Sequence, residues 1–336
     1  MKVVIPCRIL LILAEFKIPF CKSIVNTANQ TITNLWQPVG QCPACESSHS
    51  KLRQNLTSTH YVFGKKAIPL PEQGISLVQC ADCSLVYKTI VPTKAYLLDI
   101  FNQQTEQAWS DHYHFRPEKT LIESLIAKPT FDLLDIGPAH GGLLKAFKDS
   151  GGKRAGLDVI QHTDVNAYLR GEFIQGLLEE PTLIWENEPY DMVTAFDIFE
   201  HLYQPVLAFA NLRRLVKKEG FIVLETGDIC NFWVKKFGLP EWWYVNLFEH
   251  HIFWSEYAFY KFVRQQGFEV IHFTRKRHKN LACLPTLNRM VATLKDSLYI
   301  ISPSYYKKLM TALGKPSIQP FCIFTKDHFQ AVLKKI

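Results

Sequence analysis

Short apolar runs alternate with longer amphipathic stretches through the last two thirds of the chain. Each run has the length of a buried strand, and most of the stretches between them carry apolar residues at helical spacing. Strands that alternate with helices pair in parallel, so the pattern predicts a doubly wound α/β sheet. We predict seven strands, at residues 131–136, 153–158, 172–174, 190–197, 221–225, 268–273 and 326–334.

Capping residues and glycines predict where the helices between these strands begin and end. A helix over residues 142–150 stops before a pair of glycines. Pro205 opens a second helix that runs to Lys217, and Ser255 begins a third that ends at Gly267. The turn chemistry therefore agrees with the alternation of strands and helices.

Two stretches add to this minimal pattern. Residues 226–254 are unusually aromatic and follow the fifth predicted strand. Because they leave the sheet at its carboxyl edge, we expect them to overhang that edge as a lid or substrate wall. Residues 280–315 have a moderately amphipathic helical pattern, so we expect a helical insertion at about residues 278–317, between the last two strands.

A glycine-containing loop follows the first predicted strand, at the edge where such sheets bind ligands. A pyrophosphate would need backbone N–H groups here, but Pro138 lacks one and Asp135 adds a negative charge. The same carboxylate suits a ligand with positive charge and no phosphate, such as S-adenosylmethionine, which carries a sulfonium and an ammonium group. Asp158, at the end of the second strand, is placed to accept the hydroxyls of a ribose. Both a dinucleotide and S-adenosylmethionine contain a ribose, so Asp158 alone does not distinguish them.

Two Cys-x-x-Cys pairs precede the predicted sheet, Cys42 with Cys45 and Cys80 with Cys83. Four thiolates at such spacing suit a tetrahedral structural Zn²⁺, and no coordination position would remain for a catalytic water. The other interpretations are a redox Cys-x-x-Cys or cysteines that bind no metal. We predict a zinc ribbon over residues 37–92.

The glycine loop resembles the first motif of class I S-adenosylmethionine-dependent methyltransferases, where Leu-Asp-Ile-Gly-Cys-Gly-x-Gly is usual. This chain departs from that motif at Pro138 and Ala139. The resemblance implies a seven-stranded Rossmann-like sheet whose last strand is antiparallel. It also implies that the cofactor is bound by Asp135, Gly137, Ala139, Gly141 and Asp158. The alternative is a doubly wound domain whose glycines only allow close packing of strand and helix.

Later segments resemble the same family. Asp197, then Glu-His-Leu at residues 200–202, resemble the segment after the fourth strand, which implies that Asp197 and His201 lie at the methyl end of the cofactor. Leu177 and Leu178 lie in the turn that the family places beside the adenine. A structural histidine at the start of a helix would explain His201 equally well, so both interpretations stay open.

A histidine in the aromatic stretch is a candidate catalytic group. Glu249-His250, with Ser255 beyond, resembles a segment of zinc-ribbon methyltransferases. Methyl transfer to an alcohol needs a base, and aromatic surroundings would lower the pKa of His250 and keep it neutral. We predict His250 as the base and His201 as a positioning group.

A zinc ribbon ahead of such a domain resembles the arrangement in methyltransferases that modify sugars or related small molecules. The resemblance implies S-adenosylmethionine-dependent methyl transfer to a small-molecule or glycan acceptor, in an α/β domain at residues 129–336 behind a helical connector at residues 93–128. The alternatives are a nucleic-acid or protein methyltransferase that docks through the ribbon, and an inactive cofactor-binding module.

Composition narrows these alternatives. The net charge of +7 is mild, and the basic residues are scattered apart from a run at 275–279, which argues against a nucleic-acid partner.

Five of the nine cysteines are isolated, so a reducing cytoplasm is the expected compartment. Residues 1–36 are too charged for a membrane span and lack a signal-peptide pattern, so we expect a poorly ordered N-terminal extension.

Overall fold

The structure is a computed structural model that describes residues 35–56, 60–63, 66–103, 115–181, 188–278, 286–314 and 325–336. Most of the N-terminal extension expected at residues 1–36 lies outside the described residues, as does part of the helical connector expected at 93–128. No helix within the described ranges has both the length and the apolar character that crossing a membrane requires.

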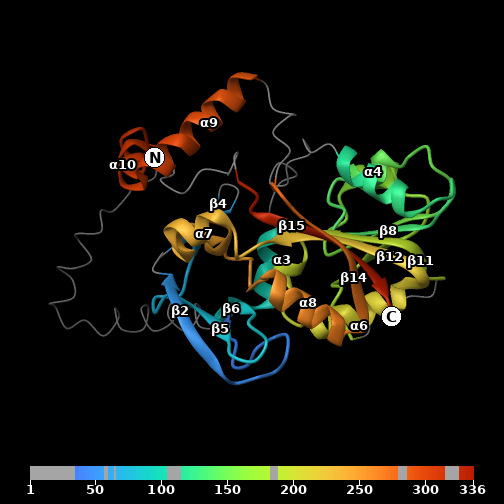
Figure 1. Ribbon diagram of the computed structural model, residues 1–336, viewed down its shortest axis with the longest axis horizontal. Helices are drawn as coiled ribbons and strands as arrows, with labels where there is room; N and C mark the ends of the chain where they lie inside the picture. The colour runs from blue at the N-terminus through green and yellow to red at the C-terminus, as the bar shows by residue number, and fades with distance from the viewer. Residues whose placement is uncertain are drawn as a thin grey trace, which may run out of the picture.

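A seven-stranded sheet forms the core of one half of the molecule, on the right in Figure 1. Its strands are β8 Leu133–Ile136, β9 Arg154–Asp158, β10 Phe173–Gln175, β11 Tyr190–Phe196, β12 Val216–Gly227, β14 Phe268–Lys276 and β15 His328–Lys335. They lie in the order β10-β9-β8-β11-β12-β15-β14. The first five pair in parallel, and β15 is antiparallel to both β12 and β14. The predicted Rossmann-like sheet with an antiparallel last strand is confirmed.

Both faces of this sheet are buried beneath helices. The helices are α4 Arg116–Leu125, α5 Gly142–Ala146, α6 Pro205–Leu215 and α8 Glu256–Gln265. Leu133 of β8 faces a core that includes Leu143 of α5, whereas the next residue, Leu134, faces a core that includes Leu212 of α6 and Phe262 of α8. Successive strand residues point to opposite faces, which explains why the strands read as continuous apolar runs.

The helix after β8 is shorter than the sequence predicts. It ends at Ala146, and the amides of Phe147, Lys148 and Ser150 bond to carbonyls three residues earlier, as in tight turns. Nε of the buried Arg154 side chain donates a hydrogen bond to the carbonyl oxygen of Phe147 at 2.7 Å. That carbonyl would otherwise continue the helix, so the arginine offers it a competing donor.

The fifth strand begins earlier than predicted, at Val216 rather than residue 221. Helix α6 correspondingly ends at Leu215, before Lys217. The ammonium of Lys217 lies 3.0 Å from Asp191 and 3.4 Å from Asp132, beside the start of β11 and β8. This ion pairing favours an extended backbone at Lys217, which helical spacing alone could not anticipate.

A smaller antiparallel sheet carries the cysteines. Its strands are β2 Ser50–Leu56, β5 Ile75–Cys80, β6 Val86–Lys88 and β13 Ile252–Phe253, in the order β13-β6-β5-β2. Two short pairs flank it, β1 Trp36–Pro38 with β7 Ile90–Pro92, and β3 His60–Phe63 with β4 Lys66–Pro69. Strand β13 comes from the distant aromatic stretch, so the cysteine-bearing sheet is joined to a loop of the larger domain.

The aromatic stretch packs as a core instead of a lid. It contains α7 Phe232–Phe237 and 3₁₀ turns at Leu239–Glu241 and Trp243–Asn246. Trp233, Trp242 and Phe248 are buried together with Leu77 of β5 and with Tyr299 of a later helix, α9 Thr286–Ile301. These buried rings pack in the core and do not form the expected wall, although Glu249 and His250 of the same stretch line the cavity described below.

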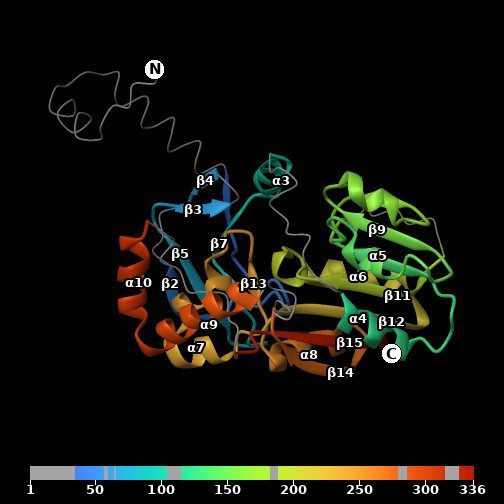
Figure 2. The ribbon, with the colours of Figure 1, turned by 90° about the horizontal axis from the view of Figure 1, so that it is seen from above.

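The remaining helices are α3 Lys94–Asn102, α9 Thr286–Ile301 and α10 Pro303–Ala312, with 3₁₀ turns at Thr163–Ala167 and Phe199–His201. Helices α9 and α10 lie between β14 and β15 in the chain. Figure 2 shows them beside α7, on the side of the molecule where β2 and β5 lie.

Candidate active site

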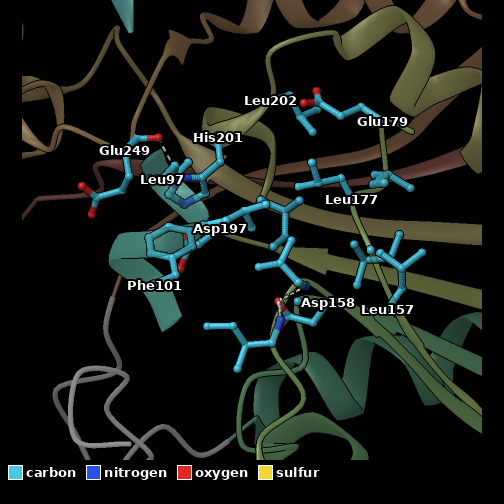
Figure 3. Close-up of a pocket in the computed structure, with 18 of the residues that line it drawn as sticks. Leu97, Phe101, Leu157, Asp158, Leu177, Glu179, Asp197, His201, Leu202 and Glu249 are labelled. Carbon is cyan, nitrogen blue, oxygen red and sulfur yellow. Dashed lines mark hydrogen bonds between the residues drawn. The ribbon is translucent and has the colours of Figure 1, made fainter. Parts of the chain in front are cut away.

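A cavity of about 410 Å³ opens at the carboxyl edge of the parallel strands (Figure 3). The predicted site residues that line it are Gly137, Ala139, Asp158, Leu177, Leu178, Asp197, His201 and His250. Two predicted cofactor residues, Asp135 and Gly141, are not among the residues that line it. The topology thus brings most of the candidate residues to one place, from four strand ends and a distant loop.

The loop between β8 and α5 has a left-handed backbone at three positions. The φ angle is 70° at Gly137, 45° at Ala139 and 78° at Gly141. The positive φ at Gly137 favours glycine, and a Cβ there would also lie 2.2 Å from the end of the Ile198 side chain, which would have to move. Ala139 adopts a conformation that an L-residue rarely takes, and such strain concentrates at functional sites.

Asp135 lies behind the cavity instead of in its wall. Its carboxylate accepts a hydrogen bond from Thr194 Oγ1 at 2.7 Å, and the side chain is buried. Burial raises the pKa of Asp135 to about 7, the charge of Asp158 adds to the rise, and the bond from Thr194 opposes it. A carboxyl group with this pKa titrates in the physiological range.

Asp158 ends β9 and holds the next loop in place. Its Oδ1 accepts the amide of Val159 at 2.7 Å, and its backbone carbonyl accepts the amide of Gly176 at 2.9 Å. Burial raises the pKa of Asp158, against the effect of its backbone hydrogen bonds. Leu177 and Leu178 follow Gly176. Asp158 therefore supplies a carboxylate to the cavity and, through its backbone bond to Gly176, also positions the two leucines.

Helix α3 supplies one wall that sequence reasoning did not assign to individual residues. Figure 3 shows Leu97 and Phe101 pointing from this helix into the cavity. Glu179 is a second omission: its Oε2 accepts the amides of Tyr203 and Gln204, at 2.8 and 2.7 Å, where α6 begins. The sequence does indicate that a helix begins at Pro205, and the first backbone amides of a helix need an acceptor from elsewhere in the chain.

Two histidines, His201 and His250, lie together in the cavity wall, with ring centroids 4.8 Å apart. His201 Nδ1 lies 2.9 Å from the carbonyl of Glu249, and His250 Nδ1 lies 3.0 Å from that of Tyr244. A carbonyl can only accept, so each Nδ1 carries the proton and each Nε2 is an acceptor in the neutral ring. Burial, aided by the charge of His201, lowers the pKa of His250 well below 6.5, as predicted.

Asp197 is half-exposed to the cavity and has a left-handed φ of 54°. His278 Nδ1 and His328 Nε2 lie 3.5 and 3.7 Å from its two carboxylate oxygens. His328 is fully buried; although burial opposes it, the charges of Asp327 and Asp197 raise its pKa to about 9. Sequence reasoning found Asp197 but not the two histidines, which reach it from the end of β14 and the start of β15.

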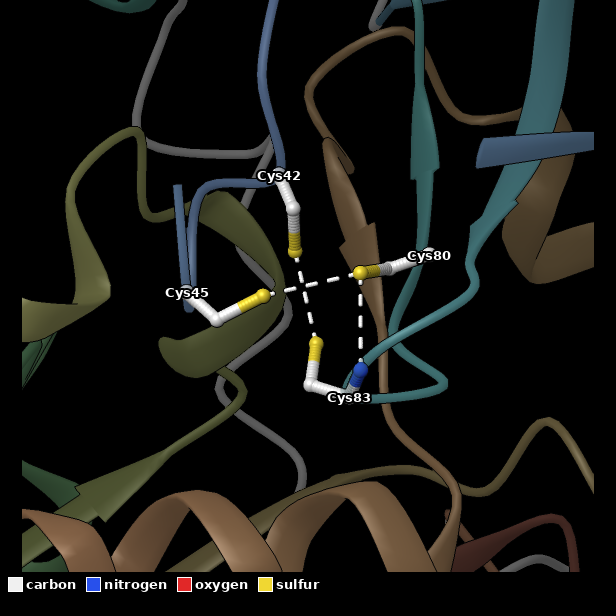
Figure 4. A group of neighbouring side chains, drawn as sticks. All are labelled: Cys42, Cys45, Cys80 and Cys83. Atoms are coloured by element: carbon white, nitrogen blue, oxygen red, sulfur yellow. Dashed lines mark hydrogen bonds between the residues drawn. The ribbon is translucent and has the colours of Figure 1, made fainter. Parts of the chain in front are cut away.

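The four predicted zinc ligands converge outside this cavity (Figure 4). Their sulfur atoms lie within 4.8 Å of one another, with Cys42 and Cys83 at 3.4 Å and Cys45 and Cys80 at 3.5 Å. Tetrahedral Zn²⁺ with bonds of about 2.3 Å would hold such atoms about 3.8 Å apart. The arrangement fits a zinc site.

The backbone around the cysteines has the same form in both pairs. The amide of Glu46 bonds to the carbonyl of Cys42, and that of Ser84 to the carbonyl of Cys80. Glu46 and Ser84 have φ angles of 60° and 66°, where glycine would be unstrained. Both residues therefore hold a strained backbone conformation, and the surrounding packing must compensate for it.

A sequence profile described as a methyltransferase domain matches residues 95–273, more than half of the chain. The chain belongs to this methyltransferase family. The predicted enzyme class, an S-adenosylmethionine-dependent methyltransferase, is confirmed by this match. No curated protein matches the methyltransferase at a significant level.

Solved structures similar to this methyltransferase are distant in sequence. The Burkholderia thailandensis 1,6-didemethyltoxoflavin-N1-methyltransferase, with S-adenosylhomocysteine bound, is 10% identical, with a TM-score of 0.47 over 83% of this chain and 99% of that one. Coclaurine N-methyltransferase, also with S-adenosylhomocysteine, is 14% identical, with a TM-score of 0.43 over 65% and 72%. A TehB-like methyltransferase from Corynebacterium glutamicum is 15% identical, with a TM-score of 0.39 over 72% and 97%.

Proposed function

We propose that this methyltransferase transfers the methyl group of S-adenosylmethionine to a small molecule, namely a sugar or an intermediate of a glycan or natural-product pathway. The observation that carries the proposal is the cavity, with Asp158 in one part of its wall and His250 in another. Its volume of about 410 Å³ is typical of pockets that bind small molecules, whose volumes are about 300–1,000 Å³.

The cofactor would occupy the part of the cavity nearest β8 and β9. Asp158 would accept the ribose hydroxyls, while Leu177 and Leu178 would contact the adenine. Gly137 and Ala139 would allow close approach of the backbone, and Gly141 would shape the same turn. Asp135 would supply negative charge near the cationic methionine end, and Asp197 would lie at the methyl end. S-adenosylmethionine supplies a methyl group already activated by the sulfonium.

His250 would remove the proton from the acceptor. Its Nδ1 is occupied by the carbonyl of Tyr244, so its Nε2 holds the free lone pair, and its low pKa keeps the ring neutral. His201, fixed in the same way by Glu249, would orient the acceptor or the base. Alignment and proton removal are the main contributions that a protein must add to this reaction.

Zn²⁺ held by Cys42, Cys45, Cys80 and Cys83 would support the fold without entering the chemistry. Such a role is supported by the full set of four thiolates, which leaves no open coordination position.

Mass spectrometry of products after incubation with isotopically labelled S-adenosylmethionine tests the proposal. The panel should contain nucleotide-sugars, free glycans and RNA, and His250→Ala serves as the matched control. Label that enters a nucleotide-sugar or glycan with the wild type, and fails to enter with the variant, would support the proposal. Label that enters RNA alone would contradict it.

A further inference from the structure

Three strand ends meet beside the cavity in a cluster that the proposed methyl transfer does not use in full. Asp197 follows β11, His278 follows β14 and His328 begins β15. One oxygen or nitrogen atom from each of these side chains lies within 4.8 Å of the other two. Two imidazoles and one carboxylate are a ligand set typical of divalent first-row transition metals.

The ligand atoms are buried, and two of them have no hydrogen-bond partner among the described residues. These two are Oδ1 of Asp197 and Nε2 of His328, which face each other at 3.7 Å. The His328 side chain is completely buried. Buried polar atoms usually have a hydrogen-bond partner, and these two form only a long ion pair, so both can still bind an ion at a shorter distance.

Asp327 orients the cluster in the way that carboxylates orient metal-binding histidines. Its Oδ1 lies 3.0 Å from His328 Nδ1 and accepts the backbone amide of His278 at 3.2 Å. Trp243 Nε1 donates to the other oxygen at 3.3 Å. A carboxylate on Nδ1 keeps a proton there, and an ion would bind Nε2 in exchange for the proton on that nitrogen, which is a common arrangement around metal sites.

The surrounding charge also favours a cation. Asp197 and Asp327 supply two carboxylates at the cluster, whereas the buried Glu225 nearby already pairs with Lys276 at 2.6 Å. The rings of Trp243 and Tyr244 pack against the histidines and cover other sides of the cluster. Asp197 is exposed to the cavity on the remaining side.

We propose that Asp197, His278 and His328 bind a divalent transition-metal ion beside the cavity, where Asp197 forms part of the cavity wall. The ion would keep a coordination position open towards the cavity, where it could hold an oxygen atom of the acceptor and lower the pKa of its hydroxyl. This second role rests on the proposed function, whereas ion binding itself does not.

The test uses the full chain with zinc retained at the four cysteines, titrated with Co²⁺ and followed by calorimetry and visible absorption. We expect one Co²⁺ per chain without a thiolate-to-cobalt band, because the cysteines are already occupied. His328→Gln should abolish this binding. Asp327→Asn, which leaves the ligands in place, should weaken it by about 10–100-fold. His272→Gln, at an exposed histidine of β14, should leave it unchanged.

Affinity for S-adenosylhomocysteine, measured on the same samples, separates this proposal from the previous one. Loss of Co²⁺ binding in a variant that still binds S-adenosylhomocysteine would support the metal site, since the variant is then folded. Wild-type Co²⁺ binding without any methyl transfer would still support the metal site and count against the proposed function. Absence of Co²⁺ binding by the wild type, or equal binding by His328→Gln, would overturn the metal site.

Discussion

The four-cysteine cluster and the cavity at the sheet edge are both built from polar atoms that converge, but they are assembled differently. Each cysteine pair is fixed by a local turn, with the same backbone hydrogen bonds in both turns. The cavity draws its polar groups from five separate parts of the chain. Spacing in the sequence therefore predicts the first site almost completely, whereas the second depends on strand order.

The two regions are nevertheless connected through one strand. Lys88, which follows the second cysteine pair, donates its backbone amide to the carbonyl of His251 at 2.9 Å. Its buried ammonium also donates to the carbonyl of Leu247. Glu249 and His250 lie between these two anchor points, so the cysteine-bearing sheet holds the segment that carries the proposed base.

Loss of zinc should produce the largest effect and should reach the cavity. We expect Cys80→Ser, or removal of the metal with a chelator, to abolish amide protection in β5, β6 and β13, because structural zinc and folding are coupled. Residues 247–251 should lose protection with them, and methyl transfer should fall. Hydrogen exchange measures both regions at once.

The matched control is Cys230→Ser, since Cys230 is exposed and belongs to no cluster. It should leave exchange unchanged. If chelation exposed β5 and β6 while residues 247–251 kept their protection, the connection between the two regions would be wrong. If freshly purified, reduced protein contained no zinc, the zinc site itself would be wrong.

Removal of the proposed base should affect chemistry and not cofactor binding. General-base catalysis contributes about 10²–10⁴-fold, so His250→Ala should lower kcat by that factor. The affinity for S-adenosylmethionine, measured by calorimetry, should stay nearly constant. His272→Ala, at an exposed histidine, is the control. Near-full turnover by His250→Ala would leave His250 with a structural role only.

Removal of Asp158, the proposed acceptor for the ribose hydroxyls, should weaken cofactor binding instead of slowing the chemical step. Asp158→Ala loses a charge-assisted acceptor worth about 1.5–3 kcal/mol, so the affinity for S-adenosylmethionine should fall about 10- to 100-fold. Asp164→Ala, an exposed carboxylate nearby, should bind normally. Unchanged affinity in Asp158→Ala would remove Asp158 from the cofactor site.

The sequence predicted the parallel strands, their order of appearance and the glycine loop after β8, because apolar runs and glycines act locally. It did not reveal Glu179, His278 or His328, whose roles depend on which strands become neighbours. The aromatic stretch shows the same limit: it follows β12 as expected, yet its rings pack against residues of β5 and α9 that are distant in sequence. Composition alone cannot tell a cavity wall from a core.

The pH dependence of cofactor affinity should be the smallest effect, and it tests whether Asp135 senses the cofactor from behind the cavity wall. Burial raises the pKa of this carboxyl group to about 7, so the free protein is mostly protonated there at pH 6 and mostly ionised at pH 8. A cationic ligand favours the ionised form and lowers this pKa on binding. Affinity should therefore rise with pH through 7, by at most about 10-fold between pH 6 and 8.

Asp135→Asn removes the titrating group while keeping an acceptor for Thr194. In this variant the affinity for S-adenosylmethionine should change little over the same range, and calorimetry at several pH values gives the comparison. A pH dependence equal to that of the wild type would mean that another group titrates. A flat wild-type profile would mean that Asp135 does not interact with the charge of the cofactor, and that its carboxyl group serves the contact between β8 and β11.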